Sequence, residues 1–244
     1  MYKRQVHRCP SCDLVEARTS QRVAVQAALD LGLSFAFLLG GNRSGKSECG
    51  AMLDVAFALG RDHPAVEEWA RINGLDVSAI QRGAGKVWAV ALDSADSLRY
   101  VRPKVARYLP AGTKWKNREG NGEAYATLPN GGRVEFKSVD QGRDGFQGEA
   151  CNLIRFDEEP RDYAVIEESD FRLADYGGRM IFTMTPLDGW TRLLREKVEH
   201  PEPDCAVYNL DGLDNPHVER SELLKRYARA GALREARQLS LIHI

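Results

Sequence analysis

The segment Gly40-Gly41-Asn42-Arg43-Ser44-Gly45-Lys46-Ser47 fits the pattern G-x-x-x-x-G-K-[ST] of a phosphate-binding loop. Glycines let such a loop curl until successive backbone N–H groups point into one hollow. A helix beginning at the loop would turn its positive end toward the phosphates. We expect Lys46 to reach the β- and γ-phosphates of ATP, and Ser47 to hold Mg²⁺. The alternative is a glycine-rich turn with an exposed lysine.

Two carboxylates, Asp157 and Glu158, follow the apolar run Leu153-Ile154-Arg155-Phe156. A buried strand that ends in two carboxylates is typical of a Walker B site. In such a site Asp157 would bind in the Mg²⁺ shell, and Glu158 would orient and deprotonate the attacking water. Acidic residues are also common at helix starts, so the pair alone is weak evidence. Its combination with the phosphate-binding loop favours the Walker B interpretation.

A third group of polar side chains stands in Thr183-Met184-Thr185-Pro186-Leu187-Asp188-Gly189. A strand that ends here would place a hydroxyl at the carboxyl edge of the sheet, where open α/β sheets bind ligands. Thr185 is the candidate for sensing the γ-phosphate and passing the change to a moving element. The alternative is a plain exit from a strand, with the proline ending it.

The elements that would position these residues can be outlined from hydrophobic patterning. Short apolar runs predict buried strands at residues 34–39, 86–92, 152–156, 179–184 and 205–210, and alternation around Pro-Asn-Gly-Gly predicts a hairpin within 124–139. Helical patterns lie near residues 23–31, after the loop to about Leu59, from Ser94 or Asp96 as cap toward Tyr108, and at 219–238. We therefore expect a mostly parallel α/β sheet with helices on both faces and one antiparallel hairpin.

Composition narrows the functional classes. The 244 residues, 43% hydrophobic and 28% charged, are enough for one sizeable α/β domain with a small appendage. The formal net charge of −1 argues against a tight nucleic-acid-binding module, but it is compatible with a motor that must release its track. No run of about 18 apolar residues is present, so no membrane span is expected.

The chain has five cysteines, an odd number, which indicates a reducing setting rather than a disulfide scaffold. Cys9 and Cys12 form a C-x-x-C pair with His7 nearby. A structural zinc site needs four ligands, and no second close pair follows, so zinc binding is the less favoured interpretation.

Taken in order, these motifs resemble the ATPase half of a phage terminase large subunit. The resemblance rests on the phosphate-binding loop, the segment Asp140-Gln141-Gly142-Arg143-Asp144-Gly145-Phe146-Gln147-Gly148, the Phe156-Asp157-Glu158 box and Thr185-Pro186-Leu187-Asp188-Gly189. Asp214-Asn215-Pro216-His217 also resembles the start of the family's linker subdomain. The resemblance covers about residues 20–238 and implies a P-loop NTPase fold of the ASCE, RecA-like kind.

The resemblance implies roles for three further side chains. Gln26 resembles the glutamine that contacts adenine, with Gln21 as its rival. Arg43 or Arg143 would be the arginine finger, acting in cis or across a subunit boundary. A surface or salt-bridge role remains the alternative for each arginine, and a solvated helix position is the alternative for each glutamine.

The resemblance also predicts an organisation along the chain. We expect a leader over residues 1–17, the ATPase domain over 18–204, a helical linker subdomain over 205–238, and a non-native or truncated end over 239–244. Family members carry a nuclease domain after the linker, and we expect no nuclease activity from this chain.

The function implied by the resemblance is an ATP-hydrolysing motor that moves double-stranded viral DNA into a procapsid. The implied partners are double-stranded DNA, the terminase small subunit, the portal protein and further copies in a ring, all in the host cytoplasm, with no membrane. One alternative is another P-loop nucleic-acid ATPase of helicase type. A non-enzymatic nucleotide-binding module is the second.

Overall fold

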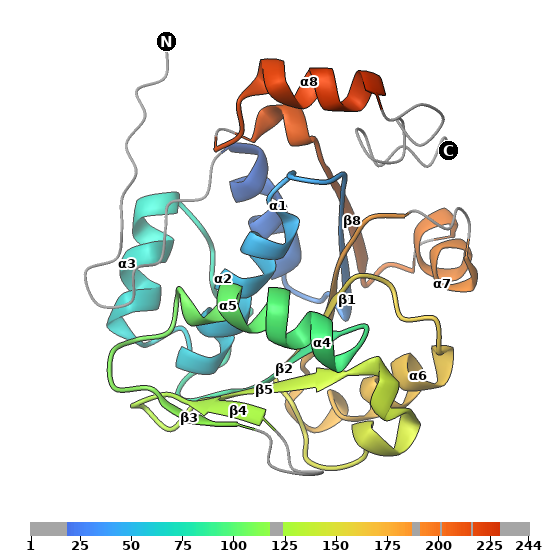
Figure 1. Cartoon of the computed structure of the whole chain (residues 1–244). Coiled ribbons are helices and arrows are strands. Elements are labelled where there is room, and N and C mark those ends of the chain that lie inside the picture. Colours follow the sequence, from blue (N-terminus) through green and yellow to red (C-terminus); the bar gives the residue numbers. More distant parts are fainter. Residues whose placement is uncertain (1–18, 118–123, 187–190, 201, 216, 230–244) are drawn as a thin grey trace.

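The computed structural model describes residues 19–117, 124–186, 191–200, 202–215 and 217–229. Within these ranges the chain folds around a single eight-stranded sheet flanked by helices (Figure 1). The strands are β1 (Phe35–Gly40), β2 (Lys86–Ala91), β3 (Lys114–Lys116), β4 (Ala124–Thr127), β5 (Arg133–Ser138), β6 (Leu153–Asp157), β7 (Arg179–Met184) and β8 (Cys205–Leu210).

The described helices fall into two groups. The α-helices are α1 (Thr19–Leu29), α2 (Lys46–Leu59), α3 (Pro64–Asn73), α4 (Ser94–Asp96), α5 (Arg102–Ala106), α6 (Tyr163–Phe171), α7 (Arg192–Leu194) and α8 (Arg220–Arg229). The π-helical and 3₁₀ segments are η1 (Ser97–Val101), η2 (Val139–Gln141), η3 (Arg143–Phe146), η4 (Ala174–Tyr176), η5 (Arg195–Glu199) and η6 (Gly212–Asp214).

The order of strands in the sheet is β3-β4-β5-β2-β6-β7-β1-β8. Neighbouring strands in the part β5-β2-β6-β7-β1-β8 of the sheet are parallel. The two remaining pairs, β3 with β4 and β4 with β5, are antiparallel. This confirms the predicted parallel sheet with its hairpin. Because β1, β6 and β7 are adjacent and parallel, their carboxyl ends, which carry the three candidate motifs, meet at one edge.

Both faces of the central strands are buried. On β1, Ala36 and Leu38 join the core formed with α1, α2, α3 and α5, while Phe35, Phe37 and Leu39 join the core formed with α6 and α7. A strand covered on both sides must be apolar at every position, which explains the continuous run at residues 34–39. In Figure 1, α3 and the α6–α7 side lie at opposite sides of the molecule.

Several elements differ from the sequence-based expectation. The boundary predicted at residue 205 falls at a strand of the main sheet, because β8 pairs with β1 along its whole length. Asp93, rather than Ser94 or Asp96, caps the next helix by accepting a hydrogen bond from the N–H of Asp96. Helix α3 was not predicted, although Pro64 in its first turn and Gly74 after it are ordinary start and stop signals.

Some predictions concern residues outside the described ranges. These are the leader over 1–17 with Cys9 and Cys12, the Leu187-Asp188-Gly189 part of the third motif, Pro216 of the linker motif, and everything beyond residue 229. Among the described helices, none has the length and apolar character needed to cross a bilayer.

Candidate phosphate-binding site

The phosphate-binding loop joins the end of β1 to the start of α2, as the sequence predicts. Gly45 caps α2 with φ 93°, a left-handed conformation that favours glycine. A Cβ on Gly45 would lie 2.1 Å from Nε2 of Gln21, and a Cβ on Gly40 would lie 2.3 Å from Oγ of Ser44. The left-handed φ is the stronger reason for glycine at position 45, because the atoms nearest to the added Cβ belong to side chains that can move.

The amino end of α2 is suited to an anion. Gly45 provides no side-chain cap, so the first N–H groups of this 14-residue helix receive no side-chain partner at the cap. Within the described residues, the buried Oγ of Ser44 also has no hydrogen-bond partner. Amides without a side-chain cap and the positive end of a helix dipole together favour an anion, and the loop fits a phosphate group on these grounds.

Lys46, Glu158 and Thr185 lie together at this edge of the sheet. The Nζ of Lys46 is 3.3 Å from Oε1 of Glu158. The other oxygen, Oε2, accepts a hydrogen bond from the N–H of Thr185 at 2.6 Å, and the Thr185 hydroxyl lies 3.4 Å from Oε1. The Thr185 hydroxyl also lies 3.0 Å from the carbonyl oxygen of Gly40. One network therefore connects the first residue of the loop, the candidate general base and the candidate sensor.

Glu158 has an unusual backbone conformation. Its φ is 78°, in the left-handed region that non-glycine residues rarely adopt. Such conformations cost about 1–3 kcal/mol and occur mainly at functional sites. Here the N–H of Glu158 donates to the carbonyl oxygen of Thr183 at 3.0 Å, which holds the turn and directs the carboxylate toward Lys46.

Asp157 lies beside Ser47, as the Walker B interpretation requires. Its carboxylate accepts from Arg155 at 3.0 Å, from the Thr183 hydroxyl at 2.8 Å and from the side chain of Ser47. Lys104 of α5 approaches its other oxygen to 3.8 Å. Burial opposes ionisation of Asp157, but the nearby cations and donors outweigh it and lower its pKa.

Arg155 was missed as a part of the site, because in the sequence it only interrupts an apolar strand. Its side chain is 1% exposed and forms a paired contact with the fully buried carboxylate of Asp54 on α2, at 2.8 Å. Burial raises the pKa of Asp54 to about 6, against the opposing pull of Arg155. Arg155 also donates to Asp157, so the buried Arg155–Asp54 pair holds the Asp157 carboxylate in place from the core side.

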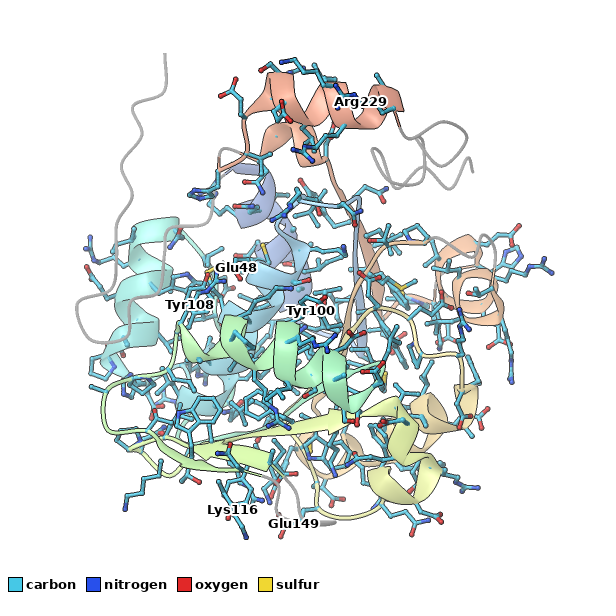
Figure 2. All side chains as sticks on the ribbon, in the orientation of Figure 1. Glu48, Tyr100, Tyr108, Lys116, Glu149 and Arg229 are labelled. Atoms are coloured by element: carbon cyan, nitrogen blue, oxygen red, sulfur yellow. The ribbon has the colours of Figure 1, made fainter. Side chains whose placement is uncertain are left out.

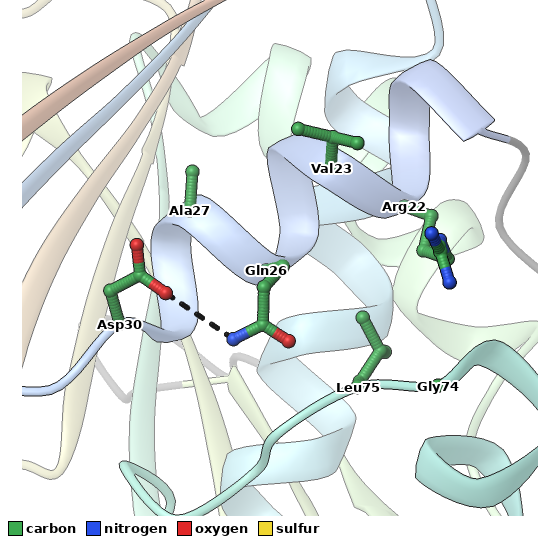
Figure 3. Close-up of a pocket in the computed structure, with 7 residues that line it drawn as sticks. All are labelled: Arg22, Val23, Gln26, Ala27, Asp30, Gly74 and Leu75. Atoms are coloured by element: carbon green, nitrogen blue, oxygen red, sulfur yellow. Dashed lines mark hydrogen bonds between the residues drawn. The ribbon is translucent and has the colours of Figure 1, made fainter.

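The structure brings Gln21, and not Gln26, to the phosphate-binding loop. The Nε2 of Gln21 lies 3.4 Å from the carbonyl oxygen of Ser44, in a buried position. The side chain of Gln26 instead bonds to Asp30 and to the backbone of Asp76. Figure 3 shows it lining a shallow cavity of about 220 Å³ between α1 and the end of α3, formed by Arg22, Val23, Gln26, Ala27, Asp30, Gly74 and Leu75.

The two candidate arginines lie in different surroundings. Arg43 is exposed within the loop at φ 70°, and its carbonyl oxygen accepts a hydrogen bond from the side chain of Asn215. Arg143 is 63% exposed and pairs with Glu168 of α6 at 3.0 Å. Its segment is anchored by Phe146, which is fully buried against Trp88 and Phe156. The described contacts of Arg143 do not include the phosphate-binding loop.

The donor set suits Mg²⁺ bound together with a nucleotide. No group of three or more His, Cys, Asp or Glu side chains able to hold a metal occurs in the described part of the chain. Mg²⁺ at phosphate sites needs only one or two protein oxygens, because phosphates and waters complete its shell. The Ser47 hydroxyl and the Asp157 carboxylate, which are in contact, provide that pair.

Comparisons with known proteins agree on one family. The family model described as "Terminase large subunit, T4likevirus-type, N-terminal" matches residues 37–237. The terminase large subunit of Salmonella phage P22 is 34% identical over 82 residues, which is 34% of this chain and 16% of the P22 protein.

Two solved structures share the fold. The large terminase of a thermophilic bacteriophage, in complex with ADP, matches 96% of this chain with a TM-score of 0.61 and 14% identity, and the chain spans 53% of that terminase. A mutant of the Thermus phage P74-26 large terminase ATPase domain, in which one arginine is replaced by alanine, matches 88% of this chain and 90% of its own length. Its TM-score is 0.52 and its identity to this chain is 19%.

Proposed function

Because the chain belongs to the family of terminase large subunits, we propose that it hydrolyses ATP and that hydrolysis drives the movement of double-stranded viral DNA. The observation that carries the proposal is the meeting of Lys46, Asp157, Glu158 and Thr185 at one edge of the sheet. The relative in complex with ADP supports a nucleotide as the ligand.

In this proposal the residues position the reactants. The loop amides and Lys46 hold the β- and γ-phosphates, and the Ser47 and Asp157 oxygens hold the cation. Mg²⁺ supplies charge neutralisation of the phosphates when it is bound. Glu158 accepts the proton of the water that attacks the γ-phosphate in line with the leaving oxygen. An arginine, Arg43 in cis or Arg143 in either mode, adds charge stabilisation.

Thr185 would connect hydrolysis to movement. Glu158 is held by Lys46 and by Thr185, and Thr185 also holds the carbonyl of Gly40. When a γ-phosphate binds Lys46, the ion pair between Lys46 and Glu158 breaks. The carboxylate then turns toward water, and its contacts with Thr185 change. Loss of the phosphate reverses the exchange, which is the usual form of a phosphate switch.

The wider role follows from the family. We propose that the chain acts in a ring of identical subunits on the portal of a procapsid in the host cytoplasm, together with the terminase small subunit. DNA would be held through its phosphates without sequence preference.

A test compares steady-state ATP hydrolysis without DNA, with double-stranded DNA, and with double-stranded DNA plus portal-bearing procapsids. The proposal predicts stimulation by duplex DNA and further stimulation by procapsids. A strand-displacement assay on a forked duplex provides the contrast. Stimulation by single strands with strand separation, and no response to procapsids, would instead identify a helicase-type ATPase.

A further inference from the structure

Lys104 is a second lysine of the site, which the sequence motifs do not include. We propose that Lys104 is a second counter-ion of Asp157 beside Arg155, and that Lys104 and Mg²⁺ are alternative partners of this carboxylate. The inference rests on the proposed nucleotide site. It concerns how the negative charge of Asp157 is neutralised when no metal cation is bound.

The position of Lys104 is fixed by the fold. Val101, Lys104, Val105 and Tyr108 follow the helical spacing i, i+3, i+4, i+7, so they share one face of the segment. Val101, Val105 and Tyr108 are at most 4% exposed, so this face is packed against the core. Lys104 therefore faces inward, and its side chain is only 28% exposed.

A π-helical turn precedes α5 and sets the direction of the helix face that carries Lys104. The turn η1 at Ser97–Val101 joins α4 to α5. A π-turn inserts one residue, which rotates the following residues by roughly 100° relative to a continuous α-helix. Within the turn, Leu98 and Tyr100 are 61% and 54% exposed, whereas Lys104, which follows the turn, approaches Asp157. Figure 2 labels Tyr100 on this segment.

Two further contacts hold α5 against the start of α2. Arg107 forms an ion pair with Glu48, the residue after Ser47, and the Tyr108 hydroxyl also bonds to Glu48 (Figure 2). Because these contacts fix the end of α5, the placement of Lys104 does not depend on its own flexible side chain alone.

The charges show what Lys104 does there. On the core side, Arg155 is shared between two carboxylates, Asp54 at 2.8 Å and Asp157 at 3.0 Å. Toward the loop, Lys46 pairs with Glu158 at 3.3 Å, and Lys104 approaches Asp157 at 3.8 Å. Each carboxylate of the Walker B pair therefore has its own lysine. Arg155 contacts Oδ1 of Asp157, and Lys104 approaches Oδ2. When a nucleotide binds without metal, Lys104 therefore shields this second oxygen from the incoming phosphates, whereas bound Mg²⁺ would take over this role.

The test measures binding of a fluorescent ATP analogue in excess EDTA and in millimolar Mg²⁺. In EDTA, Lys104→Met should weaken binding by about tenfold, because one neutralising charge beside the phosphates is lost. In Mg²⁺ the loss should be less than about threefold, so the variant depends more strongly on Mg²⁺ than the wild type does. Lys104→Arg keeps the charge and should behave as the wild type.

Arg99→Met is the matched control, because it removes one charge from an exposed side chain of the same helical segment. It should leave both dissociation constants within about twofold. Adding Asp157→Asn to Lys104→Met removes the carboxylate that has lost its counter-ion, so the double variant should recover most of the affinity that Lys104→Met loses in EDTA. This double variant separates a lost counter-ion from a general loss of folding.

Two results would overturn the inference. Equal loss of affinity with and without Mg²⁺ would show that Lys104 binds the phosphates directly, and no loss in either condition would show that it has no part in the site. If the wild type itself binds no nucleotide in either condition, the proposed function fails. That outcome is distinct from wild-type binding with an unaffected Lys104→Met variant.

Discussion

The buried pair of Arg155 and Asp54 allows a quantitative prediction about stability. Their side chains are 1% and 0% exposed, and the closest nitrogen and oxygen are 2.8 Å apart. At an effective dielectric constant of about 20, the gross attraction at this distance is about 6 kcal/mol. Desolvation of both groups offsets much of it, so the pair adds little beyond what apolar residues of similar volume would provide.

Removing one partner costs more, because it leaves the buried carboxylate of Asp54 without its cation, or leaves Arg155 with Asp157 as its remaining acidic partner. We expect Asp54→Leu and Arg155→Met each to lower the free energy of unfolding by about 3–5 kcal/mol. The double variant should be less destabilised than the sum of the two, by about 2–3 kcal/mol. The free energy of unfolding of a small domain is about 5–15 kcal/mol, so the effect of each single substitution should be readily measured.

The assay is urea denaturation followed by far-ultraviolet circular dichroism. It is run at pH 7.5, above the pKa of about 6 of Asp54, so the carboxyl is ionised in the wild type. Arg71→Met is the matched control: it removes an arginine from an exposed pair with Glu68 on α3 and should hardly move the midpoint. Strict additivity of the two buried substitutions, or single effects no larger than that of the control, would show that the two charges do not depend on each other.

Three further predictions follow from the site. Gln21→Ala should weaken ATP binding at least threefold more than Gln26→Ala, because only Gln21 contacts the loop; the reverse order would restore Gln26 as the nucleotide ligand. Burial raises the pKa of Cys49 to about 12, so at pH 8 its thiol stays protonated and should resist alkylation in the folded protein while reacting in urea, as peptide mapping would reveal. Arg143→Ala should leave the dissociation constant of ATP unchanged but lower turnover at least tenfold at protein concentrations where chains associate; an equal effect at high dilution would argue against action across a subunit boundary.

Much of the fold was readable from the sequence, because its signals are local. Strands buried on both faces must be apolar throughout, and this marked β1, β2, β6 and β7. The hairpin was marked by Asn130 and its neighbouring glycines, of which Gly131 has φ 89°. Helix α3 could have been found from Pro64 and Gly74, whereas the π-turn η1 arises from packing and leaves no comparable pattern.

The sequence predicts the site residues that belong to motifs. It does not predict the residues that only tertiary contacts bring to the site. Lys46, Asp157, Glu158 and Thr185 were predicted from their motifs, and the structure brings them together. Lys104, by contrast, belongs to no motif and reaches the site because of its position on the inward face of its helix. Arg155 interrupts a strand and gave no sign of its partner on α2, because that contact joins residues 101 positions apart.

The same limit explains the choice between the two glutamines. Gln21 and Gln26 both lie on α1, and sequence spacing alone does not determine which of them faces the loop. The packing of α1 against the start of α2 decides it, by placing the Gln21 side chain over Gly45. Helical phase was the missing information.

Lys46 and Glu158 are proposed as the catalytic part of an ATP-hydrolysing site, and their roles can be separated in one comparison. ATP binding and steady-state hydrolysis are measured in the wild type, Lys46→Ala and Glu158→Gln, with duplex DNA present. We expect the wild type to turn over ATP, Glu158→Gln to bind ATP but hydrolyse it at least a hundredfold more slowly, and Lys46→Ala to bind it poorly. Undiminished hydrolysis by Glu158→Gln, or undiminished ATP binding by Lys46→Ala, would contradict these assignments.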